Sequence, residues 1–306
     1  MTPGAQRTPR SRSCEASFPN TSAAIGRSGP NKVADFFEDF LKFCKRLPDQ
    51  AKQKIPTLST PSRLAQIQVA ALNDTVDDLT SAVDRMAFGR PVVSVYDPLD
   101  YARASFDAYL HMAAGTDQVL LVGMNPGPWG MAQTGVPFGA IEFVHGWMGI
   151  DAPIGRPAVE HPKRPILGWN CDRTEVSGAR LWGWARERFG TPKAFFDQFL
   201  VWNYCPLVFM EESGKNRTPD KLPAREKEPL FEACDRALSG VIAVTRPRLV
   251  VGVGAFAATM VKRVAGHDVP TGMILHPSPA SPAANRGWAE QAERQLSDLG
   301  VEMPQG

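Results

Sequence analysis

The chain has 306 residues and a mass of 33.4 kDa, and 43% of its residues are hydrophobic, which excludes a short peptide and a wholly disordered protein. Lysine and arginine number 34 against 32 acidic residues, so the net charge of +2 excludes a uniformly basic protein that coats nucleic acid without a defined site. The positive excess lies in residues 1–32, where five basic residues and one acidic residue leave a net charge of +4.

Residues 1–32 are rich in arginine and serine but have no helical apolar stripe, so we predict a disordered basic tail rather than a transit peptide. From Val33 to Cys44 apolar residues recur on one helical face, and a connector containing lysine and proline follows. We therefore predict a helical N-terminal extension and connector over residues 33–61. A satellite helix on the main core and a docking surface for a partner protein both explain this helix.

The main domain, residues 62–306, begins with apolar residues from Leu64 to Met86 that predict a long amphipathic helix or a broken pair. Short apolar runs without clean alternation then predict strands buried on both faces of a parallel sheet. These strands are expected at Val119–Gly123, Phe199–Trp202, Leu249–Gly254 and Gly272–Leu275, with helices at 178–188, 192–199, 230–244 and 288–299. Alternating strands and helices predict an α/β sandwich with crossover connections.

The ends of three predicted strands carry polar side chains in loops fixed by proline or glycine. Asn125 follows the first strand, Asn203 the second and His276 the last. Because ligands bind beyond the carboxyl ends of parallel strands, we expect these side chains to share one crevice. No carboxylate occupies these three turns, which argues against metal chemistry and against a glycosidase with two carboxylates.

Cysteine spacing and hydropathy limit the cellular compartment and the cofactors that we expect for this protein. The five cysteines form no CxxC or CxxH pair, which predicts reduced thiols, no disulfide framework and no metal. No apolar run is long enough to span a bilayer, and no secretory signal is present. We therefore predict a soluble intracellular protein without membrane partner or cofactor, in the cytoplasm or nucleoid of a bacterium or the nucleus of a eukaryote.

Three motifs in register carry a family resemblance. GMNPGP at 123–128 continues through GMAQTGVPFG at 130–139, and NYCPL at 203–207 and HPSPASPAANRGW at 276–288 follow. Over roughly 72–301 the chain resembles the single-strand-selective monofunctional uracil-DNA glycosylases of the uracil-DNA glycosylase superfamily. The resemblance implies a three-layer αβα sandwich with a central parallel four-stranded sheet, and a catalytic domain at 62–306. It also implies a base-excision DNA repair enzyme that flips a uracil-type base out of DNA and hydrolyses its N-glycosidic bond, leaving an abasic site.

The chemistry of this reaction is independent support. Cleavage develops positive charge on the sugar and negative charge on the departing base, so a catalyst needs a donor for the base anion and an oriented water. By resemblance, Asn125 positions the water and His276 donates a hydrogen bond to the pyrimidine O2. Without the family match, Asn125 reads as a turn residue and His276 as a satisfied histidine at a strand end.

The resemblance also implies a base-binding set. Phe138 stacks on the extruded base, and Asn203 pairs with the O4 and N3–H edge of uracil. Met124, Gly127 and Met131 line the space near O2 and C5, where 5-hydroxymethyluracil and similar oxidised pyrimidines would be tolerated and the methyl group of thymine would displace an ordered water.

Residues 279–287 resemble the wedge that enters the duplex after base flipping. Its members are Pro279, Ala280, Ser281, Pro282, Ala283, Ala284, Asn285, Arg286 and Gly287. Ala280 and Ser281 stand where an Arg-Asn pair is usual, so the sequence lacks the arginine of that pair. Trp129 and Trp202 also replace smaller or more polar residues and are expected at the pocket rim or in the core.

Residues 156–188 hold seven basic and four acidic residues, so part of this segment could track DNA phosphates, or it could form a solvated helix face. We predict a monomeric enzyme that acts on uracil in single- and double-stranded DNA. A relative with specificity shifted toward hypoxanthine or xanthine is the first alternative. A non-catalytic module that binds single-stranded DNA is the second.

Overall fold

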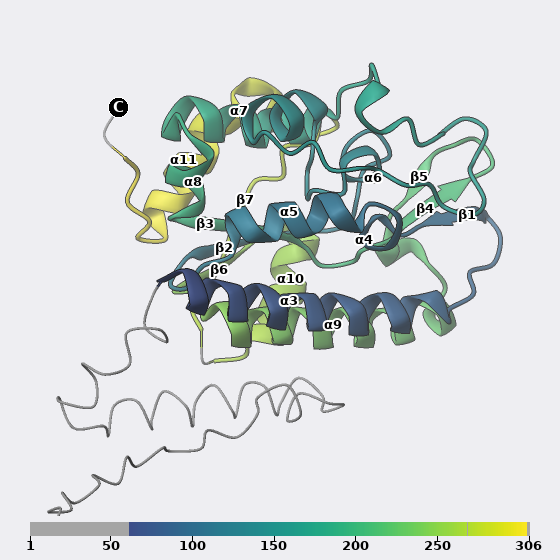
Figure 1. The fold of residues 1–306 in the computed structure, drawn as a ribbon, viewed down its shortest axis with the longest axis horizontal. Helices are drawn as coiled ribbons and strands as arrows, with labels where there is room; N and C mark the ends of the chain where they lie inside the picture. Colours follow the sequence, from purple (N-terminus) through teal and green to yellow (C-terminus); the bar gives the residue numbers. More distant parts are fainter. Residues whose placement is uncertain (1–60, 268, 305–306) are drawn as a thin grey trace, which may run out of the picture.

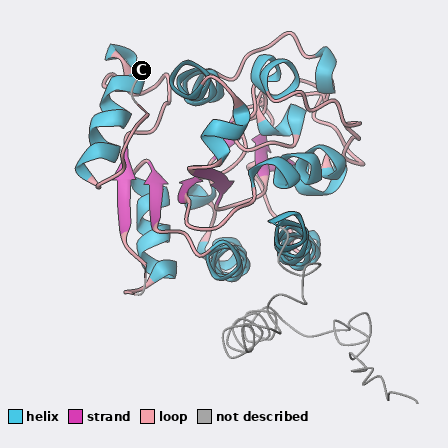
Figure 2. Cartoon of the chain, turned by 60° about the vertical axis from the view of Figure 1, so that its left-hand side comes forward, coloured by secondary structure: helices cyan, strands magenta, loops and turns pink. Residues whose placement is uncertain are grey.

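A computed structural model describes residues 61–267 and 269–304. Its centre is a parallel sheet of four strands in the order β3-β2-β6-β7. Helices lie on both sides of this sheet in Figures 1 and 2, so the predicted three-layer αβα sandwich is confirmed. The predicted tail at 1–32 lies outside the described residues, as does the predicted extension at 33–61 apart from its last residue, where the first described helix begins.

Seven strands are present in the described residues. They are β1 (Val92–Tyr96), β2 (Val119–Gly123), β3 (Phe199–Asn203), β4 (Val208–Glu211), β5 (Asn216–Arg217), β6 (Leu249–Val253) and β7 (Thr271–Ile274). Every residue of β2, β3 and β6 is buried, as expected for apolar strands covered on both faces. The four predicted strands are confirmed with boundaries that differ by one residue at most.

The helices form the outer layers. They are α3 (Pro61–Asp84), α4 (Pro98–Tyr101), α5 (Arg103–Ala113), α6 (Met131–Thr134), α7 (Val176–Phe189), α8 (Pro192–Phe196), α9 (Ala224–Thr245), α10 (Ala255–Ala265) and α11 (Trp288–Asp298). In Figure 1, α3, α9 and α10 lie below the sheet, and α7, α8 and α11 lie above it. Gly252 in β6 leaves no room for a Cβ because the backbone of α10 passes directly over it at Ala258.

One outer edge of the sheet is closed by a side chain from α5. The hydroxyl of Tyr109 donates to the carbonyl of Val201 (2.6 Å) and accepts from its amide (3.1 Å). The outward-facing amide and carbonyl of Val201 in edge strand β3 are therefore satisfied without another strand. Trp202 is 2% exposed and packs edge-to-face on Phe106, so it lies in the core rather than at the pocket rim.

A second, antiparallel sheet in the order β1-β4-β5 was not predicted from the sequence. Its strands are short, and β1 alternates between buried and exposed residues, so it lacks the continuous apolar signal of the central strands. Helices α5 and α10 were also missed. The predicted helix at 230–244 begins six residues earlier, at Ala224, and Pro229 lies inside it. Glu226 holds the first turn of α9 in place, because its buried carboxylate accepts a hydrogen bond from the amide of Gly89 (3.2 Å).

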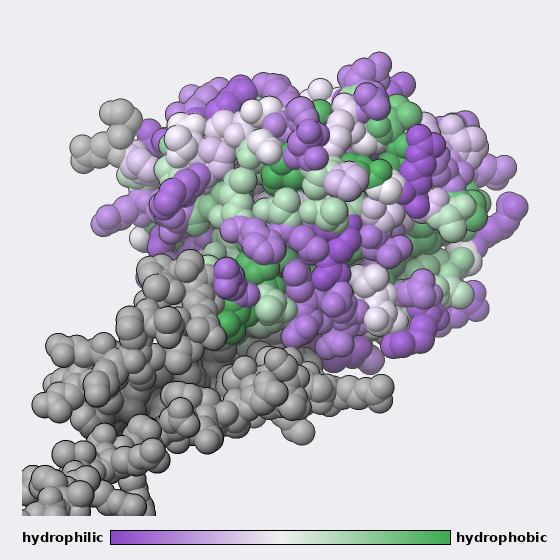
Figure 3. Space-filling model, viewed as in Figure 1, coloured by the Kyte–Doolittle hydropathy of each residue, from purple (hydrophilic) through white to green (hydrophobic). Residues whose placement is uncertain are grey.

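The surface and the cysteines complete the fold. Hydrophilic side chains predominate on the face drawn in Figure 3, with apolar residues in small separate areas. No helix within the described ranges is long and apolar enough to cross a membrane. Cys171, Cys205 and Cys234 are buried free thiols, and burial together with the neighbouring Cys205 raises the pKa of the Cys234 thiol. These three cysteines therefore pack as small apolar residues.

Candidate active site

The carboxyl ends of β2, β3 and β7 lie at one edge of the sheet and bring the predicted polar residues together. Gly123 ends β2 and is paired with Asn203 at the end of β3. A Cβ on Gly123 would collide with the amide oxygen of Asn203 and with the ring of Phe138, so both side chains close over this glycine. His276 follows β7, and its ring centroid lies 6.0 Å from that of Phe138. A single pyrimidine base can contact all three side chains.

Asn125 lies in a loop whose backbone is fixed at several points. Its amide nitrogen donates to the carbonyl of Leu207 (3.1 Å). Its Oδ1 accepts no hydrogen bond from the described residues. Asn216 of β5 donates to the carbonyl of Pro126 (3.0 Å), and the amide of Cys205 donates to the carbonyl of Met124 (2.9 Å). The unpredicted small sheet thus holds this loop, and Asn125 presents an acceptor suited to orienting a water.

Gln133 is a buried supporting residue that sequence reasoning missed. Its amide nitrogen donates to the carbonyls of Pro128 and Pro165, both at 3.0 Å, and its oxygen accepts from the amides of Leu167 (2.8 Å) and Gly168 (3.2 Å). All four hydrogen-bonding positions of the side chain are used at 0% exposure. Gln133 therefore joins the Asn125 loop to the segment at 164–168. A glutamine in GMAQTG gives no sequence signal for this role.

Phe138 has a left-handed backbone with φ of 55°, a strained conformation for an aromatic residue. Its surroundings enforce this geometry. The indole of Trp182 donates to the carbonyl of Pro137 (3.1 Å), and Gly178 of α7 lies so close to the Phe138 carbonyl that no Cβ fits there. The ring is half-buried and therefore accessible for stacking. The structure thus places Phe138 beside Gly123 and Asn203, and its role in stacking remains a prediction.

Asn203 is 7% exposed, and its amide nitrogen lies 3.2 Å from the sulfur of Met131. Sulfur is a weak acceptor, so this contact can give way to a stronger oxygen acceptor on a ligand. Met131 itself is buried at the start of α6. Gly127 lies against the carboxyl group of Glu175 rather than in open space. Phe138, Asn203 and Met131 thus lie together at the end of β2, whereas Gly127 faces Glu175.

Glu175 is the second residue that sequence reasoning missed. A Cβ on Gly127 would collide with its carboxylate, and the backbone amide of Trp129 hydrogen-bonds to it. Burial raises the pKa of the Glu175 carboxyl, and the Trp129 hydrogen bond acts in the opposite direction. Although no carboxylate occurs in the three strand-end turns, tertiary folding therefore places one directly behind the Asn125 loop.

His276 is positioned by the residues on both sides of it. The amide of Leu275 donates to Gln295 (2.7 Å), and the indole of Trp288 donates to the Leu275 carbonyl (2.6 Å). The His276 side chain packs over Gly254, the residue after β6, whose φ of 90° favours glycine. Burial lowers the pKa of the His276 imidazole from its ordinary value. A neutral imidazole is therefore favoured at neutral pH.

The predicted wedge is a surface loop braced from α7. Arg180 donates to the carbonyls of Pro277 (3.2 Å) and Ser278 (3.3 Å), and to the side chain of Asn285 (2.7 Å). Asn285 in turn donates to the carbonyl of Pro279 (2.9 Å). Pro279, Ala280, Pro282, Asn285, Arg286 and Gly287 are exposed, whereas Ala284 is buried at 2% exposure. Ala284 therefore supports the loop and does not form its tip.

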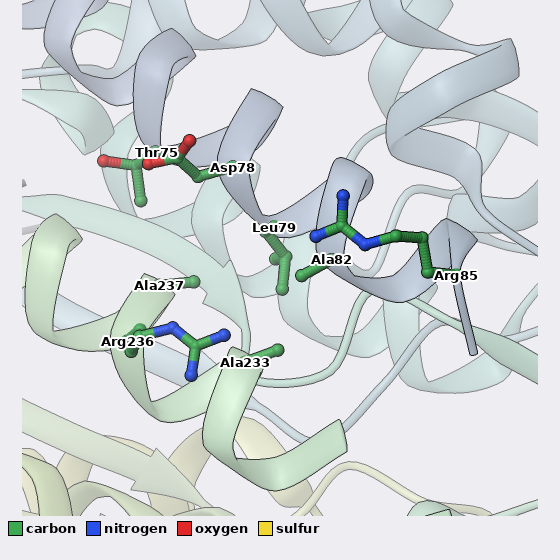
Figure 4. Close-up of a pocket in the computed structure, with 8 residues that line it drawn as sticks. All are labelled: Thr75, Asp78, Leu79, Ala82, Arg85, Ala233, Arg236 and Ala237. Carbon is green, nitrogen blue, oxygen red and sulfur yellow. The ribbon is translucent and has the colours of Figure 1, made fainter. Parts of the chain in front are cut away.

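The strand-end residues are separate from the hollow that lies between two of the outer helices. A hollow of about 230 Å³ lies between α3 and α9 (Figure 4), and its lining contains none of the strand-end residues. Within residues 61–267 and 269–304, no three His, Cys, Asp or Glu side chains are grouped so that they could hold a metal ion. The group of side chains at the strand ends is therefore the candidate active site.

Comparisons with known proteins identify the family of this chain. A family model described as the uracil DNA glycosylase superfamily matches residues 112–297. Single-strand selective monofunctional uracil-DNA glycosylases of Mus musculus and Rattus norvegicus are each 45% identical over 227 residues, covering 73% of this chain and 81% and 82% of those proteins. The enzyme of Bos taurus is 44% identical, covering 73% of this chain and 84% of that protein.

A solved structure gives the same fold. The crystal structure of wild-type Pedobacter heparinus SMUG2 matches with a TM-score of 0.55 at 16% identity, covering 74% of this chain and 97% of that chain. At this identity the likeness supports the fold alone, whereas the family rests on the sequence matches. The chain therefore belongs to the uracil DNA glycosylase superfamily, and within it to the single-strand selective monofunctional uracil-DNA glycosylases.

Proposed function

We propose that this protein is a monofunctional DNA glycosylase that hydrolyses the N-glycosidic bond of uracil in DNA and leaves an abasic site. The observation that carries the proposal is the convergence of Asn125, Asn203 and His276 with Phe138 at one edge of the sheet, in a chain of this family. A non-catalytic binding module would not need a water-orienting amide and an anion-stabilising imidazole in the same crevice.

The proposed mechanism uses hydrogen bonds in place of a catalytic carboxylate. Oδ1 of Asn125 accepts a hydrogen bond from the attacking water and aims it at the anomeric carbon. The imidazole of His276 donates to the base O2 as negative charge develops there. One such pre-organised donor is worth about 3–4 kcal/mol of transition-state stabilisation. The lowered pKa of His276 is compatible with this role, because a neutral imidazole still carries one N–H donor.

Base selection is assigned to Phe138 and Asn203. The ring stacks on the extruded base, a contact worth about 1–3 kcal/mol, which is close to the few kcal/mol needed to flip a nucleotide from a duplex. Asn203 offers a donor to O4 and an acceptor to N3–H of uracil, whereas cytosine presents the opposite pattern. A buried site that leaves such groups unmatched discriminates by roughly 10⁴ or more.

Two finer assignments extend the proposal. By family resemblance Met124 and Met131 are assigned to the C5 side of the base, so 5-hydroxymethyluracil is included as a substrate. Double-stranded DNA is included because the braced loop at 279–287 serves as a wedge. The narrow balance between stacking and unpairing favours single-stranded or mismatched uracil over paired uracil.

A panel of oligonucleotides tests the function. Single- and double-stranded DNA carrying uracil, 5-hydroxymethyluracil, hypoxanthine or thymine is incubated with the protein, and abasic sites are scored by alkaline cleavage. We expect cleavage at uracil, fastest in single strands, weaker cleavage at 5-hydroxymethyluracil and none at thymine. Faster release of hypoxanthine would instead support the alternative with shifted specificity. Binding without any abasic sites would overturn the enzyme proposal.

The duplex assignment has its own test. Ala280 is an exposed residue of the wedge, where Ala280→Arg adds a cation without disturbing the core. We expect duplex uracil excision to improve by about fivefold, the order of one favourable surface charge contact, with a smaller gain on single strands. An equal gain on both substrates would contradict a wedge role for residue 280.

A further inference from the structure

Trp129 follows the Asn125 loop, and two arginine side chains stack on its indole ring. The guanidinium carbon of Arg164 is 5.0 Å from the centre of the indole, and that of Arg173 is 4.7 Å from it. Two like charges repel each other, so their gathering on one ring requires compensation. The indole ring supplies part of that compensation and fixes the position of both cations relative to Trp129.

Ion pairing distinguishes these arginines from the other arginines that stack on aromatic rings. Arg186 lies over Phe143 and pairs with Glu142 at 2.8 Å. Arg263 lies over Phe231 and pairs with Asp235 at 2.6 Å. Within the part of the chain that the structure describes, neither Arg164 nor Arg173 pairs with a carboxylate; the two groups therefore lack the anion that the other stacked arginines have.

Neither of the two acidic residues near Arg173 in the sequence supplies this anion: Asp172, the residue before it, forms no ion pair within the described residues. Glu175 is two residues from Arg173, but its carboxyl group faces Gly127 and the amide of Trp129, and its pKa is raised by burial. Nε of Arg164 is buried and has no hydrogen-bond partner, so this guanidinium is partly desolvated. A partly desolvated guanidinium without a counter-ion gains more from binding an anion than a fully hydrated guanidinium does.

The arginines are also coupled to the catalytic loop. Gln133 joins the carbonyls of Pro128 and Pro165, the residues next to Trp129 and Arg164. Arg164 packs from its other side against Gly214 in the β4–β5 turn. Trp129 follows Asn125 by four residues, so their Cα atoms are at most about 14 Å apart. The two cations therefore lie within a few nucleotides of any base that reaches Asn125.

We propose that Trp129, Arg164 and Arg173 form a phosphate-binding site that holds the DNA strand next to the flipped uracil. This inference rests on the proposed glycosylase function and assigns part of the 156–188 segment to phosphate contacts. Guanidinium groups bind phosphate oxygens in a bidentate manner, and the indole keeps both groups in place before DNA arrives. The site contacts the backbone and reads no sequence.

The test measures binding of a single-stranded oligonucleotide without uracil as salt is varied. Each lost phosphate contact should reduce the slope of log K against log salt by about 0.7 for single strands. We expect this change in Arg173→Gln and in Arg164→Gln, about twice the change in the double variant, and restoration in Arg173→Lys. Trp129→Leu keeps both charges, so its affinity should fall with a smaller change in slope.

Arg186→Gln is the matched control, because Arg186 stacks on an aromatic ring but already has a carboxylate partner. Its slope should equal that of the wild type. An equal decrease of the slope in Arg186→Gln would show that net charge alone explains the effect and would overturn the site. An unchanged slope in a folded Arg173→Gln variant would also overturn it. Because Arg173 is exposed, its replacement is not expected to lower Tm, which thermal unfolding checks.

Uracil release is measured separately in the same variants. For Arg173→Gln we expect KM on single-stranded substrate to rise several-fold, with a smaller change in kcat. If the wild type released no uracil while the salt slopes still differed, the glycosylase proposal would fail and the phosphate site would stand. If the wild type released uracil while all variants kept the same salt slope, the glycosylase proposal would stand and the phosphate site would fail.

Discussion

The loops after β2 and β7 carry the two proposed catalytic residues, yet they are held in different ways. The Asn125 loop is fixed from within by Gln133, which is fully buried, and by Asn216 of the small sheet. The His276 loop is fixed by Arg180 and Gln295 and continues into the exposed wedge. The residue proposed to orient water is therefore supported from the interior, while the proposed DNA wedge is supported at the surface.

This difference has an energetic consequence. Removing a buried hydrogen-bonding side chain leaves its partners unsatisfied, whereas partners at the surface can turn to water. Damage to the support of Asn125 should therefore lower the free energy of unfolding. Damage to the support of His276 and the wedge should instead change how DNA is processed, with less effect on the fold.

The catalytic pair itself gives the largest expected effect. Asn125→Ala and His276→Ala should each lower kcat by about 10²–10³, because each removes one pre-organised hydrogen bond of the transition state. Single-turnover release of uracil measures the loss, and binding to single-stranded DNA should persist. His111→Ala, an exposed histidine outside the crevice, is the control and should match the wild type. Unchanged turnover in either catalytic variant would refute its assigned role.

Gln133→Leu breaks the interior support. Four backbone groups lose their partner in a buried site, so the free energy of unfolding should fall by about 3 kcal/mol, measured by urea denaturation. Gln198→Leu removes one exposed hydrogen bond, to the carbonyl of Glu302, and should change it by less than about 1 kcal/mol. Equal stability losses in the two variants would contradict the contrast between interior and surface support.

Arg180→Gln breaks the surface support. It removes hydrogen bonds to Pro277, Ser278 and Asn285, so we expect kcat/KM on duplex uracil to fall by about tenfold, equivalent to about 1.4 kcal/mol. Single-stranded substrate, which does not need the wedge, should be affected less. Arg180→Lys should recover part of the loss. A uniform fall on both substrates, matched by a fall in Tm, would indicate a structural role alone.

The smallest effect concerns pH. Because burial lowers the pKa of His276, its imidazole stays neutral until the pH falls below the ordinary value of about 6.5. The unfolded chain is protonated first, so this group reduces stability as the pH falls from about 6.5 through the lowered pKa. If the neutral form is active, the acidic limb of kcat/KM should lie below pH 6.5. In His276→Asn, which cannot titrate, that limb should disappear from the residual activity.

Sequence periodicity was sufficient for the central sheet and insufficient for its surroundings. The runs at 119–123 and 249–254 are continuous and apolar because their strands are covered on both faces, so their signal is local. Strand β1 is half exposed and pairs with β4 more than a hundred residues away, so its neighbours determine its structure. The start of α9 likewise depended on the contact between Glu226 and Gly89.

The sequence by itself determined the family, the four central strands and the polar residues that end them, because each of these is written in contiguous residues. Only the tertiary structure decided what supports and surrounds the site: Gln133 behind the Asn125 loop, Glu175 against Gly127, and two arginines on Trp129. These side chains meet across long stretches of chain, and such contacts depend on the packing of the layers. Local patterns carry no information about them.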